Sequence, residues 1–294
     1  MPDMLESPLG SVEAYVAFFS RQDIPALRHT VRALASLREQ EESVNGRHIA
    51  SIVMGDPLMT IKLLVHLQTH RSLAQNHDVT TVDRVIMMMG ISPFLRAFEN
   101  VPTLEDWLSG HPRALLGALK VIGRARSAAR YARDWAIARR DVDVDEITVA
   151  ALLRETTEIT CWTFAPELTQ RIRNMQEMDL RLRSSVAQKV VFGFTEREIQ
   201  LGLIKAWRLP ALLAALLDEE HVDNPRVRNV RLASEFARHR ARGWDDPALP
   251  DDIAAIERLL HIGREPLLRR LGTPPEQMQR FMSPTQGAPP KNEA

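Results

Sequence analysis

The sequence predicts an all-α protein, and three observations support that prediction. Apolar residues recur with the 3.6-residue period of an amphipathic helix along nearly the whole chain. No segment shows the strict apolar–polar alternation of a half-buried strand. Residues that start and stop helices separate these periodic segments often enough to predict about ten to fourteen helices.

The first helix starts can be placed from capping residues. Asp56 followed by Pro57 gives an N-cap carboxylate and a proline at the first helical position, ahead of the apolar segment 58–67. Thr80 to Asp83 has the form of a capping box and opens a helix that Gly90 is expected to end.

A long helix is expected over about residues 113–140. Spacings of three and four place a stripe of small apolar residues on one face, which lets a neighbouring helix approach closely and predicts a central position in a bundle. The stripe consists of Ala118, Ile122, Ala125, Ala129, Ala132 and Ala136. The other face carries Arg124, Arg126, Arg130 and Arg133. These arginines form either a solvated face or an anion-binding surface.

Further starts follow towards the C-terminus. Thr195 to Glu198 repeats the capping-box form, and Pro210 begins another apolar segment. Asp251 and Asp252 are expected to cap a helix that ends at Gly263.

Turn-forming residues and prolines mark the expected joints between parts of the chain. Segments 99–112 and 222–226 are predicted to connect separate helical parts of the chain, and 243–252 is predicted to be a loop. Residues 273–294 are rich in proline and poor in apolar residues, so we expect a disordered tail with at most one helical turn around Met278 to Met282.

Composition excludes several classes of protein. The chain has 294 residues, of which 45% are hydrophobic, so it can bury a sizeable core without disulfides. It contains one cysteine, Cys161, which suits a reducing, cytoplasmic environment. We expect no membrane insertion and no secretion signal, because no apolar run is long enough and the N-terminus lacks a basic region before an apolar one. Equal numbers of acidic and basic residues, 38 each, argue against a dedicated nucleic-acid binder.

Residues that could support catalysis or bind a metal are few. His66 and His70 have the i, i+4 spacing of a ligand pair, but no acid–base glutamate lies between them and no third ligand is evident. His77-Asp78 precedes the expected capping box, so we expect Asp78 to belong to that turn. Cys161 lies among apolar residues and reads as a buried small hydrophobe. We therefore expect no catalytic residue, no metal and no cofactor.

Five stretches in a fixed order resemble a known family. They are Ile24-Pro25-Ala26-Leu27 with 31–37, the segment Ile49 to Leu64 around Asp56-Pro57, Val79 to Gly90, Ala150 to Leu153, and Leu201-Gly202 with Trp207 to Pro210. Together they resemble the HDOD domain (HD-related output domain) of bacterial signalling proteins over residues 21–222. The resemblance implies a multi-helix HDOD-type bundle, made of an N-terminal helical bundle (21–105) and an HD-like helical bundle (113–222). A lead-in (1–20) would precede it, and a C-terminal helical extension (223–272) and the tail would follow.

Departures from the HD pattern bear on the mechanism that the resemblance implies. By position, Arg126 stands where an HD phosphohydrolase has its first histidine, and Arg154-Glu155 stands where it has its His-Asp pair. A guanidinium has no lone pair to offer a metal and stays charged, so the metal site is expected to be lost. Where the family tends to have Asn-Ser after the Asp-Pro helix, this chain has 66–70 (HLQTH), which weakens any surface role carried over to that helix.

The resemblance implies a non-enzymatic signal-transduction module that acts on a protein partner. Met87, Met88, Phe94 and Phe98 form either the contact surface or ordinary core. The alternative function is binding of a nucleotide, such as a cyclic dinucleotide, or of nucleic acid through arginine-rich helices, including the segment 226–242. The anion-binding candidates are Arg126, Arg130, Arg154, Arg231 and Arg238. A surviving phosphohydrolase is a third interpretation.

Overall fold

The computed structural model describes residues 3–39, 44–70, 81–179, 181–218 and 223–282, and helices dominate these ranges as expected. The helices of the N-terminal part are α1 (Val12–Ser20), α2 (Arg28–Glu39), α3 (Gly46–Met54), α4 (Pro57–His70), α5 (Val82–Met89), α6 (Ile91–Ala97) and α7 (Leu104–Trp107). Those of the central part are α8 (Pro112–Arg139), α9 (Val144–Leu153), α10 (Thr156–Phe164), α11 (Pro166–Met178), α12 (Ser184–Phe192), α13 (Glu196–Ala206) and α14 (Ala211–Leu217). The C-terminal helices are α15 (Pro225–Arg240), α16 (Leu249–Leu260), α17 (Arg264–Arg270) and α18 (Pro275–Met282).

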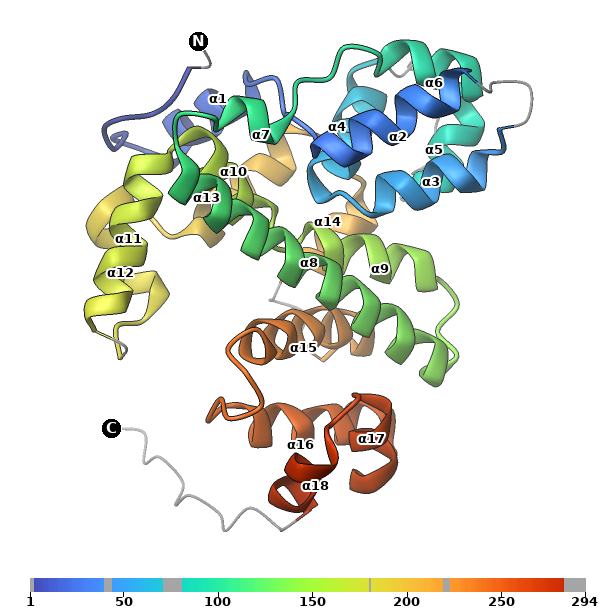
Figure 1. The fold of residues 1–294 in the computed structure, drawn as a ribbon, viewed down its shortest axis with the longest axis vertical. Helices are drawn as coiled ribbons and strands as arrows, with labels where there is room; N and C mark the ends of the chain where they lie inside the picture. Colours follow the sequence, from blue (N-terminus) through green and yellow to red (C-terminus); the bar gives the residue numbers. More distant parts are fainter. Residues whose placement is uncertain (1–2, 40–43, 71–80, 180, 219–222, 283–294) are drawn as a thin grey trace.

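Helix α8 runs diagonally through the middle of the molecule, between the helices of the N-terminal part and the C-terminal group α15–α18 (Figure 1). All six residues of the predicted stripe are buried, which confirms the central position. Helices α9, α10 and α15 pack against α8. The small side chains of the stripe explain why these neighbours fit so closely.

The predicted Asp56 cap is present and does more than cap. Its carboxylate accepts hydrogen bonds from the backbone N–H groups of Leu58 (3.0 Å) and Met59 (3.2 Å), at the start of α4. It also accepts one from Leu27 (2.7 Å), just before α2. One buried side chain therefore fixes the approach of two helices. Burial raises the pKa of Asp56 even though three N–H groups surround it.

The two predicted capping boxes differ in outcome. At Thr195 the box is complete, because its hydroxyl accepts from the Glu198 N–H and the Glu198 carboxylate accepts from the Thr195 N–H. At the start of α5, Thr80 lies outside the described residues, and Thr81 occupies the N-cap position without a side-chain capping bond. Gly90 ends α5 as predicted, at φ +80°, a conformation that favours glycine.

The N-terminal helix α1 belongs to the central bundle. It packs against α13, where Gly202 leaves room for Val16: a Cβ at position 202 would lie 2.5 Å from the nearest Val16 methyl group. The Tyr15 hydroxyl donates a hydrogen bond to the Phe192 carbonyl (2.9 Å). The expected lead-in is therefore a structural part of the bundle.

Three expected boundaries were wrong in detail. Helix α16 begins at Leu249, so the two aspartates lie in its first turn, and it ends at Leu260 before a left-handed His261. The expected joint 99–112 contains α7. The start of the expected tail forms α18, two turns long, because Phe281 is buried and packs on Trp244 with ring centroids 6.0 Å apart. Residues 283–294 lie outside the described part.

No helix in the described ranges is both long and apolar enough to cross a membrane.

Candidate functional site

A cavity of about 570 Å³ lies among α8, the α9–α10 corner, α11, α12, α13 and α15. The chain turns sharply between α9 and α10, with Arg154 ending one helix and Glu155 beginning the next. This corner is the position at which the sequence resemblance places the altered His-Asp pair, so the cavity is the candidate functional site.

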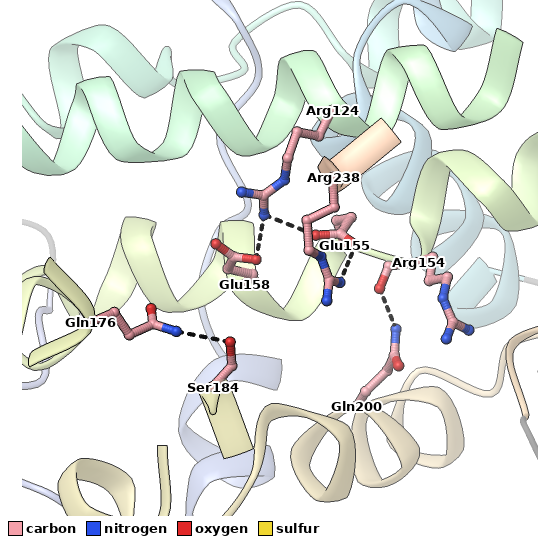
Figure 2. Close-up of polar contacts among 8 residues, drawn as sticks. All are labelled: Arg124, Arg154, Glu155, Glu158, Gln176, Ser184, Gln200 and Arg238. Carbon is pink, nitrogen blue, oxygen red and sulfur yellow. Dashed lines mark hydrogen bonds and ion pairs between the residues drawn. The ribbon is translucent and has the colours of Figure 1, made fainter. Parts of the chain in front are cut away.

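Glu155 is the centre of a cluster of ion pairs in this cavity. One carboxylate oxygen accepts from Arg124 of α8 (3.0 Å), and the other accepts from Arg238 of α15 (2.8 Å). The same Arg124 nitrogen also donates to Glu158, one turn further along α10 (2.6 Å). Figure 2 shows the two guanidinium groups on either side of the Glu155 carboxylate. The cluster thus joins three helices that are far apart in sequence.

Burial and charge act in opposite directions on these carboxyl groups. Burial alone would raise the pKa of Glu155, but the positive charges of Arg238 and Arg124 outweigh burial and hold this pKa at about 2. Burial raises the pKa of Glu158 in spite of the nearby Arg124. Burial and the negative charges of Glu158 and Glu155 raise the pKa of Glu196 well above its usual range. One carboxylate that is ionised at neutral pH therefore lies beside two that more readily take a proton.

The structure places the three altered HD positions differently from one another. Glu155 lies in the cavity. Arg154 lines the cavity, but its guanidinium points away from Glu155 (Figure 2), and its backbone carbonyl accepts a hydrogen bond from Gln200 (2.8 Å). Arg126 does not line the cavity; its guanidinium donates to the Gly55 carbonyl and lies 3.0 Å from His29.

Of the anion-binding candidates Arg126 and Arg154, only Arg154 lines the cavity, and Arg124 rather than Arg126 contributes to it from α8. Residues two apart on a helix point about 200° away from each other, so a shift of two positions moves a side chain from one face to the other. The sequence reasoning assigned Arg124 to the outer face of α8. It also missed Glu158, although the i, i+3 spacing of Glu155 and Glu158 places both on one face of α10.

Most arginines of the segment 226–242 contact neighbouring groups, so fewer of them are free than an open basic surface would require. The contacts are Arg226 with Asp143 and Glu146 (both 3.1 Å), Arg231 with Glu235 (3.8 Å), Arg238 with Glu155 (2.8 Å), Arg240 over the Trp244 ring (3.8 Å) and Arg242 with Asp246 (3.5 Å). On α8, the exposed Arg130 guanidinium lies 5.4 Å from the centre of the Tyr131 ring. A nucleic-acid interface needs cations that are free to meet phosphates.

The histidine and cysteine candidates lie outside the cavity lining. The His66 and His70 rings stack with centroids 4.0 Å apart, and burial lowers the pKa of His66. Within the part of the chain that is described, no three His, Cys, Asp or Glu side chains group as metal ligands would. His77-Asp78 lies outside the described residues. Cys161 is buried as expected, and burial raises the pKa of its thiol well above the usual range.

The suggested contact surface divides into two parts. Met87 and Met88 are exposed, at 72% and 41%, whereas Phe94 and Phe98 are buried, at 0% and 4%. The two phenylalanines pack on each other with centroids 5.0 Å apart, and Phe98 also contacts the His66 ring (5.1 Å). Phe94 and Phe98 are core residues, so only the methionines remain as surface candidates.

The fold and the cavity define a helical bundle with an ion-pair cluster at the corner between α9 and α10. The model of the HDOD domain family matches residues 24–222, and the chain belongs to this family. No curated protein matches this sequence.

Two solved structures share the fold at low sequence identity. A virulence factor from Campylobacter jejuni is 16% identical, with a TM-score of 0.67 over 94% of this chain and 98% of its own. The MmoQ response regulator from Methylococcus capsulatus is 19% identical, with a TM-score of 0.62 over 85% of this chain and 98% of its own. Both likenesses concern the fold.

Proposed function

We propose that this HDOD protein is a non-enzymatic module of a bacterial signalling pathway and acts by contact with a protein partner. Membership of the HDOD family supports a signalling role, and one protein that shares the fold is described as a response regulator. The cavity chemistry supports the absence of catalysis.

The observation that carries the proposal is that both carboxylate oxygens of Glu155 are bonded to guanidinium groups. A divalent metal is held by lone pairs, such as those of imidazole nitrogens and of carboxylate oxygens that are free to bind it. None of the described residues that line the cavity is a histidine, cysteine or aspartate, and two cations already neutralise its central carboxylate. The side chains present therefore fit an ion-pair cluster better than a metal centre.

Loss of catalysis is tested with the purified full-length chain. After incubation with Mn²⁺ and dialysis, we expect no stoichiometric metal by elemental analysis and no hydrolysis of bis-p-nitrophenyl phosphate. The triple variant Arg126→His, Arg154→His, Glu155→Asp should stay inactive, because Arg126 faces away from the cavity. Tight metal binding with turnover by the unmodified protein would contradict this part of the proposal.

Protein contact is tested at the two exposed methionines of α5. A photo-crosslinking amino acid at Met87 should give a discrete adduct with a second protein in the source cells. Met178, which is also strongly exposed but lies at the end of α11, is the matched control and should give none. Equal labelling at both positions, or no adduct at Met87, would count against this surface.

A further inference from the structure

The two arginines in the Glu155 cluster keep hydrogen-bond donors to spare. A guanidinium carries five N–H donors on three nitrogens. Arg124 contacts Glu155 and Glu158 through one terminal nitrogen, and Arg238 contacts Glu155 through one terminal nitrogen. Their other nitrogens make no hydrogen bond to the described residues, and the buried Nε of Arg124 is left without a partner. Both side chains line the cavity.

The charges around the cavity favour an anion. Seven cationic side chains line it against four carboxylic ones. The cations are Lys120, Arg124, Arg154, Arg173, Arg197, Arg238 and Arg242, and the acids are Glu155, Glu158, Glu196 and Glu235. Burial raises the pKa of three of these acids, so they take up a proton more readily than an exposed glutamate does. Three of the cations also have partners outside the cluster, namely Glu177, Asp218 and Asp246.

The size and walls of the cavity indicate that the anion has an organic part. A volume of about 570 Å³ falls within the range of small-molecule pockets and far exceeds a single phosphate. Trp162 and Ile172 supply an apolar wall, while Gln176 and Ser184, hydrogen-bonded to each other at 2.9 Å, supply polar groups. A guanidinium group is planar and can donate two parallel hydrogen bonds to the oxygens of one phosphate.

We propose that this cavity binds a small organic phosphate monoester, whose phosphate is held by the uncommitted N–H groups of Arg124 and Arg238. Glu155 acts as a positioning residue, because each of its two carboxylate oxygens holds one of the guanidinium groups. The inference rests on the proposed function in one respect, since the ligand is bound and released without hydrolysis.

The first experiment uses AMP as the probe and adenosine as its uncharged match. Calorimetric titration of the full chain should give saturable binding of AMP, weaker binding of inorganic phosphate and none of adenosine. Affinity should fall as salt is added, because the contacts are ionic. Equal binding of AMP and adenosine, or no binding of inorganic phosphate at about 10 mM, would overturn the inference.

Phosphorus NMR on the same samples separates the two proposals. Bound AMP should broaden its signal while no inorganic phosphate peak grows. Growth of that peak would overturn the proposed loss of catalysis, whereas an unperturbed AMP signal would overturn the ligand site.

Variants locate the binding. Arg238→Gln should weaken AMP binding at least about tenfold, because it removes charge-assisted hydrogen bonds. Arg124→Lys keeps the positive charge but lacks the planar set of N–H donors, so it should also weaken AMP binding. Arg269→Gln is the control, because Arg269 is exposed on α17 and pairs with Glu265 away from the cavity. Wild-type affinity in both cavity variants, with melting temperatures showing that they fold, would refute the site.

Discussion

Glu155→Gln isolates the energetic value of the ion-pair cluster. The substitution keeps the shape of the side chain and one acceptor oxygen, but it removes the charge that faces Arg124 and Arg238. Since the wild-type carboxylate is only 4% exposed, little solvent screens these contacts.

The magnitude follows from the pKa of the carboxyl group. Glu155 has a pKa of about 2 in the folded chain, against an ordinary value of 4.5. Each pKa unit corresponds to about 1.4 kcal/mol, so ionisation of Glu155 stabilises the fold by about 3 kcal/mol at neutral pH. A depressed pKa gives stability that is present above 4.5 and is lost as the pH falls towards about 2. Near pH 3 about half of it should remain.

Urea unfolding followed by tryptophan fluorescence measures this contribution. At pH 7, E155Q should lower the free energy of unfolding by about 3 kcal/mol, and the difference from wild type should shrink by about half near pH 3. The control Glu265→Gln breaks an exposed i, i+4 pair with Arg269 and should cost less than about 0.5 kcal/mol. Equal losses in the two variants, or a loss in E155Q that does not change with pH, would refute the reasoning.

Three further predictions concern packing and titration elsewhere in the bundle. Gly117→Ala should destabilise by about 1–3 kcal/mol, because a Cβ there would lie 2.7 Å from a buried indole. Gly123→Ala on the same helix meets nothing within 4 Å and should stabilise by about 0.5–1 kcal/mol, so the two melting temperatures should move in opposite directions. Cys161 should resist Ellman's reagent at about pH 8 in the folded chain and react fully in urea, since burial raises the pKa of its thiol; rapid labelling without urea would contradict this. The hydrogen bond to Asp252 raises the pKa of His239, so its stabilising contribution is present below the ordinary pKa of 6.5 and is lost as the pH rises through the raised one. Urea unfolding should therefore show that His239→Ala costs more at about pH 6 than at about pH 9, and equal costs would count against this pairing.

Features that depend on local sequence were predicted well. The stripe on α8, the Asp56 cap and the Thr195 capping box each follow from residues within one or two helical turns. Their geometry is fixed by the 3.6-residue period and by backbone groups that need partners at a helix end.

Features that depend on packing between distant segments could not be read from the sequence. Glu155 and Arg238 are 83 positions apart, and nothing local to either residue specifies the pair. The choice between Arg124 and Arg126 depends on the rotation of α8 against its neighbours. Short motifs of low specificity do not align a helix with a family pattern to within two residues. Helix α18 packs on the rest of the chain through the contact of Phe281 with Trp244. The proline-rich composition of the tail gave no indication of this contact.

The cavity also shows that the family match and the physical unit have different boundaries. The family model ends at residue 222, yet Arg238 comes from α15, and this helix packs along α8. Asn229 of α15 donates a hydrogen bond to the Ala132 carbonyl (3.1 Å), within the small-residue stripe of α8. Without α15, Glu155 would keep only Arg124 as a cationic partner among the described residues, and α8 would lose one of the helices packed against it. The extension therefore belongs to the same packed unit as the site, because it supplies one of the two cations that face Glu155.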